Sequence, residues 1–433
     1  MSFNISLSGL NAASSDLDVT SDNISNSATV GFKGSRAEFA DVFASSQLGV
    51  ASNAIGQGVR LQNVAQQFTQ GQFDFTGNSL DLGVNGEGFF RMSDEEGAVS
   101  YTRNGAFQLD NEGQIVNADG LQLTGYPADN DGNIGGETGP LQVNTGNVPP
   151  QATSDIDVNA NLQSSAEPTG AEFDPDDPES YNFSTATTVY DTQGGSHSAN
   201  FFFTKIAPDD DEIDNIGDDV PGEGQNTWAV DLEVAGMTPD GDDARRFINF
   251  NEDGSFGSVT DADGGDIGDQ AYVFPADPDN PLAGAEDLEM DVDYSTLTQF
   301  GTPSAVSEIR QNGFEAGEFS SLEVEEDGTI FGRYTNGESR ALGQVALARF
   351  PSEQNLTEIG DNLWVESAES GEPIIGEPGT SSLGGIQGGA LEQSNVDITE
   401  QLVNMITAQR NFQANAQMIS TQDQVTQEIL NIR

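Results

Sequence analysis

The start of the chain carries the most restrictive pattern in the sequence, an apolar stripe with helical spacing set among residues unsuited to helices. The large apolar side chains of this stripe are Leu7, Leu10, Leu17 and Ile24. Their three- and seven-residue steps place them on one face of a helix. Residues 14–29 are nonetheless rich in Ser, Thr, Asn and Asp, whose side chains compete for backbone hydrogen bonds. We therefore expect a helix within residues 1–32 that is too weak to persist alone.

The end of the chain, residues 394–433, contains a second stripe of this kind. Ser394 followed by Asp397 fits the Ser-x-x-Asp signal for the start of a helix. No glycine or proline occurs after Val396, so we predict a helix of about 35 residues, about 50 Å long. Many Gln, Asn and Thr residues make this helix weak as well. Its stripe consists of Ile398, Leu402, Met405, Phe412, Ala416, Ile419 and Leu430.

Between the two ends the pattern changes to that of β-strands. Residues 80–126 contain Asn-Gly, Glu-Gly and Asp-Gly turn signals every seven to eleven residues, separated by short apolar runs. This spacing predicts an antiparallel meander. A similar block occupies residues 313–350. We expect the two blocks to form one discontinuous inner β domain, made of residues 80–145 and 301–375.

Residues 146–300 separate these blocks and include the most acidic part of the chain. Strand patterns occur at residues 184–206, 227–234 and 245–257. Residues 207–224 are predicted to be a long solvated loop. We therefore expect a separate outer, acidic, all-β domain here.

The sequence as a whole predicts a multidomain, mainly β protein. Two nested all-β domains, one a meander and one barrel-like or sandwich-like, lie between N- and C-terminal helices. Residues 33–79, rich in Gln, Gly and Phe, and the Gly-rich residues 376–393 are expected to be connectors.

The charge of the chain excludes several classes of partner. Its 433 residues include 72 acidic and 14 basic side chains, for a formal charge of -58. A nucleic-acid-binding protein needs basic side chains to displace counterions, so we expect no nucleic acid partner and no binding to anionic membranes. Such charge repels itself at ordinary ionic strength and is screened at about 1 M salt, where the Debye length is about 3 Å. We interpret it as adaptation to high salt, and an ordinary acidic surface is the alternative.

Other compositional features narrow the choice further. Cysteine is absent, which excludes disulfides and thiolate chemistry. No apolar run approaches the 18 residues of a membrane span, so we expect no membrane insertion. The N-terminal sequence lacks the basic and apolar regions of a cleaved secretory signal.

The candidates for catalysis and ligand binding are weak. His197, the one histidine, lies in a predicted hairpin. The segment 86–91 approaches a phosphate-binding glycine loop but has Arg91 in place of the third glycine. The acidic segments 129–136 and 261–269 depart from the calcium-loop pattern. We therefore predict no catalytic residue, cofactor or metal site, and a protein that is not an enzyme.

Both ends of the chain resemble a known family. Residues 8–43 resemble the start of bacterial flagellar axial proteins, and residues 388–424 resemble the matching C-terminal end. Residues 23–33, NISNSATVGFK, resemble the hook type rather than the rod type. The β segments "VNGEGFFRMS" and "TTVYDTQGGSHSANFFFTK" resemble the family's inner and outer domains. The acidic loops at 207–224 and 261–292 depart from the family pattern.

This resemblance implies a structural subunit that polymerises into the flexible, curved flagellar hook and transmits motor torque from rod to filament. The terminal helices would remain disordered until assembly and then form a coiled-coil-like inner core. The implied assembly interface is Leu7, Leu10, Leu17, Ile24, Leu402, Met405, Phe412 and Ile419.

The resemblance also implies where the protein functions and with what. The location would be the extracellular flagellum, at the hook and basal body, reached through the flagellar type III export apparatus without a cleaved signal. Further partners would be rod and hook-associated junction proteins and the hook cap. The alternatives are a distal rod or hook-associated protein of the same family, or a salt-adapted secreted adhesin.

Overall fold

The structure is a computed structural model that describes residues 2–42, 56–129, 132–169, 173–206, 226–239, 245–261, 267, 271–277, 280–380 and 382–431. The chain divides into two compact units. The first unit consists of Met1–Thr145, Ser320–Arg333 and Ser339–Arg433, and the second unit of Gly146–Phe319 and Tyr334–Glu338. The loop predicted at residues 207–224 lies outside the described residues.

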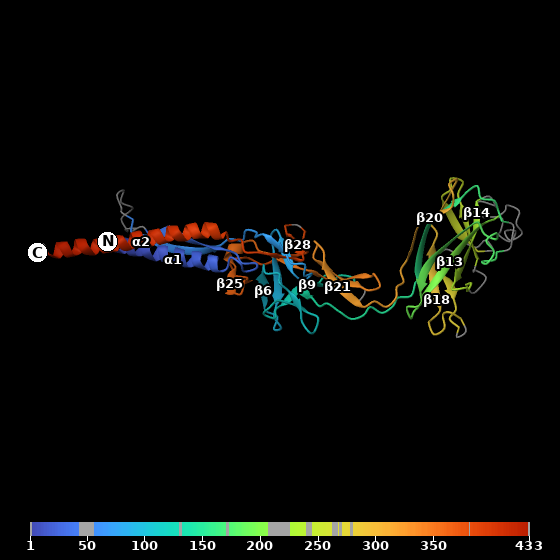
Figure 1. Cartoon of the computed structure of the whole chain (residues 1–433), viewed down its shortest axis with the longest axis horizontal. Helices are drawn as coiled ribbons and strands as arrows, with labels where there is room; N and C mark the ends of the chain where they lie inside the picture. Colours follow the sequence, from blue (N-terminus) through green and yellow to red (C-terminus); the bar gives the residue numbers. More distant parts are fainter. Residues whose placement is uncertain are drawn as a thin grey trace. The chain divides into compact units, whose positions relative to one another are not determined.

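Two helices from opposite ends of the chain pack side by side in the first unit (Figure 1). Helix α1 spans Ser2–Ser25 and α2 spans Ile398–Asn431, a length of 34 residues. The prediction of terminal helices is confirmed. Among the residues that the structure describes, no helix is both long and apolar enough to span a membrane.

The start of α2 differs from the one predicted at Ser394. The carboxylate of Asp397 accepts hydrogen bonds from the backbone N–H groups of Thr399 at 2.7 Å and Glu400 at 3.2 Å. Asp397 is therefore the N-cap, and these backbone hydrogen bonds lower its pKa. The predicted start at Ser394 is wrong by three residues, because aspartate caps a helix as well as serine does.

A β-hairpin packs against α1 within the segment that was expected to be a connector. Strands β1 (Ser35–Asp41) and β2 (Val59–Gln66) pair antiparallel. The hydroxyl of Ser8 on α1 accepts a hydrogen bond of 3.2 Å from the backbone N–H of Val59. The hairpin therefore forms part of the helical end of the first unit.

The rest of the first unit, here called the body, is built around a 13-stranded sheet. Strands from both sequence blocks pair in it, as β23 does with β9, β24 with β5 and β26 with β6. The 13-stranded sheet consists of β5 (Phe89–Ser93), β6 (Val99–Thr102), β7 (Gln108–Leu109), β8 (Ile115–Val116), β9 (Gln122–Pro127), β10 (Gly139–Pro140), β21 (Phe319–Val324), β22 (Thr329–Tyr334), β23 (Ser339–Val345), β24 (Leu347–Arg349), β25 (Thr357–Gly360), β26 (Leu363–Val365) and β27 (Ile374–Gly376). Outside it lie the short helix η1 (Glu353–Asn355) and the strands β3 (Phe73–Phe75), β4 (Leu82–Asn85), β28 (Gly385–Gly388) and β29 (Ala390–Glu392).

Two further pairings and an aromatic cluster connect the body of the first unit to its helical end. Strand β28 pairs with β4, and β29 pairs with β3. The rings of Phe89 and Trp364 meet edge to face with centroids 5.7 Å apart. The indole N–H of Trp364 donates a 2.7 Å hydrogen bond to the side-chain oxygen of Gln66 on β2. The hairpin is thereby tied to the buried core of the body.

The second unit consists of two five-stranded sheets. One contains β11 (Asp155–Gln163), β17 (Tyr272–Phe274), β18 (Leu288–Asp293), β19 (Thr298–Phe300) and β20 (Ala305–Gln311). The other contains β12 (Phe183–Tyr190), β13 (Ser196–Lys205), β14 (Thr227–Val234), β15 (Arg245–Phe250) and β16 (Phe256–Thr260). The strands predicted from residues 184–206, 227–234 and 245–257 are confirmed.

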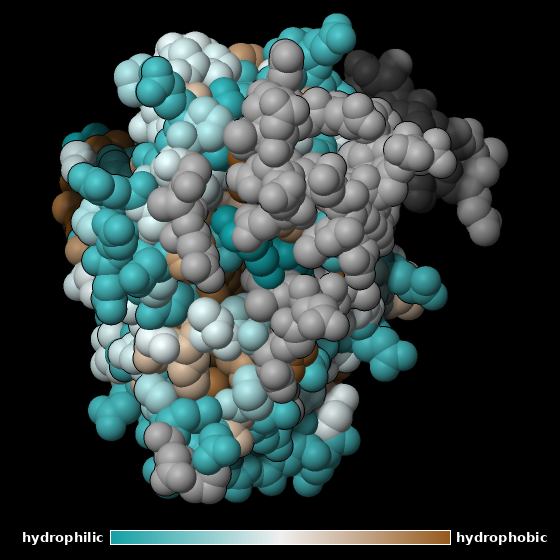
Figure 2. Space-filling view, turned by 90° about the vertical axis from the view of Figure 1, so that its right-hand side faces the viewer, coloured by the Kyte–Doolittle hydropathy of each residue, from teal (hydrophilic) through white to brown (hydrophobic). Residues whose placement is uncertain are grey.

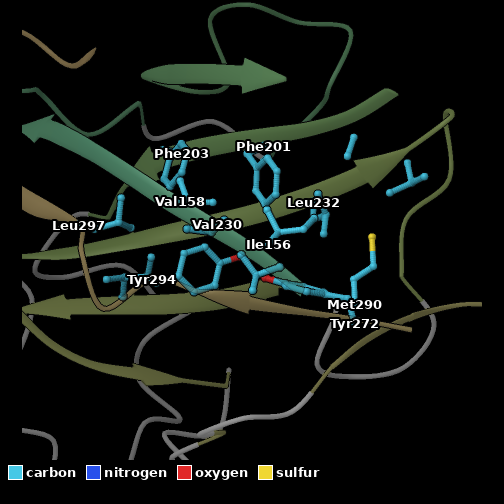
Figure 3. Packing of buried hydrophobic residues seen from close by; sticks show 14 of the residues in the cluster. Ile156, Val158, Phe201, Phe203, Val230, Leu232, Tyr272, Met290, Tyr294 and Leu297 are labelled. Atoms are coloured by element: carbon cyan, nitrogen blue, oxygen red, sulfur yellow. The ribbon is translucent and has the colours of Figure 1, made fainter. Parts of the chain in front are cut away.

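The two sheets of the second unit share one hydrophobic core. Side chains alternate between buried and exposed along β11. Ile156 and Val158 of this strand meet Phe201 of β13 and Leu232 of β14 in the same cluster (Figure 3). The unit is therefore a sandwich of two sheets. The residues that Figure 2 shows in colour on one face of this unit are mainly hydrophilic.

Candidate assembly site

Helix α2 has one face turned toward α1. Within residues 398–428, and apart from Ala416, the least exposed side chains recur at alternating steps of four and three. These side chains are Gln401, Met405, Ala408, Phe412, Asn415, Ile419 and Gln422. The heptad spacing is that of a coiled-coil seam.

Helix α1 meets this seam with small and polar residues. Its most buried side chains are Ser6, Ala13, Thr20 and Asn23, and their spacing places them on one face. Gly9 lies on the same face, where an added Cβ would be 2.7 Å from Oδ1 of Asn415. The glycine therefore permits a close approach of the two helices.

The helices run antiparallel. Gly9 near the start of α1 meets Asn415 well inside α2, whereas Asn23 near the end of α1 donates a 3.4 Å hydrogen bond to Gln401 at the beginning of α2. Burial raises the pKa of Asp16 on α1, so its ionised form weakens the packing at neutral pH. The contact between the helices thus combines small and polar side chains of α1 with partly buried apolar side chains of α2.

The predicted interface residues divide into two groups. Met405, Phe412 and Ile419 are half-buried and lie in the seam with α1. Leu10, Leu17 and Ile24 are also half-buried, on the flank of the seam residues of α1. Leu7 and Leu402 remain 40% and 46% exposed. The structure therefore places only part of the predicted set inside the subunit.

Two exposed apolar side chains beside Leu402 were not in the predicted interface, although Ile398 belongs to the predicted stripe. Ile398 and Ile406 are each 50% exposed and lie four residues before and after Leu402. That spacing aligns the three side chains on one face of α2, here called the α2 ridge. On the hairpin, Phe39 and Leu61 are exposed cross-strand neighbours. The signal for the ridge was the recurrence of large apolar residues at four-residue steps.

Sequence reasoning also missed a buried ion cluster between the helices and the 13-stranded sheet. Glu392, at the end of β29, lies 2.7 Å from Nζ of Lys33 and 3.3 Å from a guanidinium nitrogen of Arg103. Burial lowers the pKa of Lys33, and Glu392 opposes that shift. The three residues are far apart in the sequence, and no local pattern reveals their contact.

The histidine considered for catalysis takes part in hydrogen bonds that stabilise a turn. Nε2 of His197 on β13 lies 2.7 Å from Oδ2 of Asp191, in the turn that joins β12 to β13. Asp191 also accepts hydrogen bonds from the backbone N–H groups of Gln193 and Gly195. Among the described residues, no group of three or more acidic or histidine side chains could hold a metal ion.

The Asp191 contacts give a pH prediction. Burial raises the pKa of Asp191, but the hydrogen bonds from His197, Gly195 and Gln193 outweigh that effect and lower it overall. The carboxylate therefore stabilises the fold above its unfolded pKa of about 3.9, and the contribution is lost as pH falls through the lower folded value. Asp191→Asn should cost about 1–3 kcal/mol at pH 7.

Calorimetry of the wild type and Asp191→Asn across pH checks this expectation. The difference in melting temperature between them should shrink as pH falls below about 4. A difference that stays the same down to pH 3 would contradict the assigned role of the carboxylate.

Four family models match the chain in order. They are the flagella basal body rod protein at residues 3–33, the flagellar hook protein FlgE/F/G D1 domain at 83–164, the flagellar basal body protein FlaE D2 domain at 157–314, and the flagellar basal body rod FlgEFG protein C-terminal domain at 387–432. Together they account for both ends and most of the middle.

Known relatives match over the whole length. The flagellar hook proteins FlgE of Salmonella typhimurium and of Escherichia coli are each 36% identical over 444 residues, covering 100% of this chain and 100% of the relative. The one from Treponema pallidum is 30% identical, covering 99% of this chain and 98% of its own.

A solved structure supports the fold. The crystal structure of Helicobacter pylori flagellar hook protein FlgE2 is similar at a TM-score of 0.52 and 14% identity, covering 74% of this chain and 100% of that chain. With the full-length relatives, these matches establish that the chain belongs to the flagellar hook protein FlgE family, as a structural, non-enzymatic subunit of the extracellular bacterial flagellum.

Proposed function

We infer that copies of this chain polymerise through their terminal helices into a flexible, curved tube that transmits motor torque from rod to filament. The observation that carries this inference is the α2 ridge of Ile398, Leu402 and Ile406, which is exposed beside a seam already occupied by α1. A row of exposed apolar side chains on a helix is typical of a surface that another element covers. Membership of the hook family implies self-polymerisation, and a second copy supplies a matching helix pair.

The predicted interface residues act at two levels in this proposal. Met405, Phe412 and Ile419 hold α2 against α1 within a subunit, flanked by Leu10, Leu17 and Ile24. Leu7 and Leu402 project toward neighbouring subunits. Because the seam of α1 is small and polar, the helix pair gains most of its stability from covering by neighbours. The ends therefore become fully ordered on assembly.

The proposal assigns a layer of the tube to each part of the chain. Residues 1–32 and 394–433 form the inner core, the rest of the first unit forms a middle layer, and the second unit, residues 146–319 with 334–338, forms the outer layer. The tube connects to rod and hook-associated junction proteins and grows beneath a hook cap. Subunits reach it unfolded through the flagellar export apparatus.

Removal of the second unit separates tube formation from tube curvature. In a strain lacking the gene, the full chain should restore curved hooks visible by electron microscopy. A chain lacking residues 146–319 should restore short tubes without normal curvature, because the segments that form the inner core are untouched. Normally curved hooks, or the absence of tubes, would contradict this assignment of layers.

A further inference from the structure

The ion cluster of Lys33, Arg103 and Glu392 is deeply buried, and it has no role in the function proposed above. The three side chains are between 0% and 2% exposed. Only 14 basic residues occur in the chain, and two of them share this single carboxylate. Removing charges from water is costly unless each is paired and hydrogen-bonded.

Both cations of the cluster also donate hydrogen bonds to the backbone of the body. Lys33 donates a 2.9 Å hydrogen bond to the carbonyl of Thr69, and Arg103 donates one of 2.9 Å to the carbonyl of Gly86. The backbone N–H of Gly71 donates a 2.8 Å hydrogen bond to the carboxylate of Glu392. Glu392 therefore connects the N-terminal segment to the loop that follows the hairpin.

The backbone beside the cluster joins the two ends of the chain directly. The N–H of Gly31 donates to the carbonyl of Glu392 at 2.8 Å, and the N–H of Gly34 donates to the side-chain oxygen of Asn395 at 2.8 Å. Asn395 also donates to the carbonyl of Thr69 at 3.1 Å. These contacts lie between the end of α1 and the start of α2.

Because of these charges, the N-terminal segment that carries Lys33 and the C-terminal segment that carries Glu392 can pack on the body only together. Without Glu392, Lys33 and Arg103 would be buried together with no anion between them. Without the two cations, Glu392 would be a buried carboxylate with no ionic partner. Losing one member of a buried ion set is strongly destabilising because the remaining charge is left uncompensated.

We propose that the ion cluster is a latch through which the N- and C-terminal segments dock on the β body together or not at all. Residues 26–34 do not dock on the body unless residues 389–396 also dock there, and the reverse also holds. The ion cluster is thereby one joint between the helix pair and the body, in addition to the contact of Trp364 with Gln66, and a force on either helix reaches the sheet through it. This inference concerns the single subunit and does not depend on polymerisation.

Hydrogen exchange measured by mass spectrometry on the full-length subunit tests the latch. Glu392→Gln should accelerate exchange at least tenfold in residues 26–42 and 67–72 as well as in residues 389–396. The matched control is Glu38→Gln, which removes one negative charge from an exposed ion pair on β1 and should leave these segments unchanged. Acceleration confined to residues 389–396 would overturn the proposal.

A second set of variants keeps the test decisive if Glu392→Gln folds poorly. Glu392→Leu alone should release both ends, because two buried cations remain. Combining it with Lys33→Met and Arg103→Met removes every charge and should restore protection of residues 26–42, since apolar replacement of a whole buried ion set is tolerated. A triple variant no better protected than Glu392→Leu would overturn the proposal.

Discussion

Replacing Leu402 and Ile406 with glutamine should abolish tube formation while the subunit itself stays folded. Both side chains are about half exposed on the α2 ridge, so the change should alter the stability of the monomer by no more than about 0.5 kcal/mol. Because about half of each side chain is already buried, covering the rest by a neighbour would contribute about 0.7–1.5 kcal/mol per residue. The total of about 1.5–3 kcal/mol per subunit contact corresponds to a loss of affinity of about 10- to 100-fold, and every subunit of the tube repeats that loss.

Electron microscopy of the variant strain and circular dichroism of the purified subunit measure the two halves of this expectation. The matched control replaces Asn404 and Asn411 with glutamine; both are exposed, and their helical spacing places them on the side of α2 away from the ridge. Hooks should persist in the control and disappear in the ridge variant. Normal hooks in the ridge variant would exclude the ridge from the assembly contact.

The structure also changes what a different double substitution would test. Leu17→Ala with Phe412→Ala targets two stripe residues that the sequence assigns to contacts between subunits. Phe412 instead lies half-buried in the seam with α1. Its loss should weaken the pairing of the two helices within each subunit, and tubes would fail for that reason.

The helices and hairpins could be predicted because their signals are local. Apolar spacing revealed both terminal helices, and turn glycines revealed the β12–β13 hairpin. The seam of α1 was not recognised because a search for apolar periodicity selects Leu7, Leu10 and Leu17. Close helix packing selects small residues such as Gly9 and Ala13, which such a search ignores.

The joining of the two β blocks could be predicted, but contacts between individual side chains of distant segments could not. Glu392 and Lys33 are 359 residues apart, and Glu392 and Arg103 are 289 apart. In a chain with 72 acidic residues, a single glutamate is ordinarily interpreted as part of the surface. Strands β1 and β2 were missed for a related reason, because residues 42–58 separate the partners in the sequence and this spacing is too long for a two-residue hairpin signal.

The melting temperature of the subunit should rise steeply with salt. The formal charge of -58 produces repulsion that falls as the Debye length shortens from about 10 Å at 0.1 M to about 3 Å at 1 M. A rise on the order of 10 °C between about 0.1 and 2 M sodium chloride corresponds to several kcal/mol for domains of this size. Potassium chloride should act equally, because screening depends on ionic strength.

Charge reversal at exposed positions provides the matched test of that cause. Asp176 and Glu179 lie exposed on the second unit, and each replacement by lysine lowers the net negative charge by two. If repulsion limits stability, the double variant should melt higher than the wild type at low salt. The gain should disappear near 2 M, where the remaining charges are screened in both proteins. A melting temperature that stays flat with salt, or a gain that persists at 2 M, would show that self-repulsion does not limit stability and that the acidity is an ordinary surface feature.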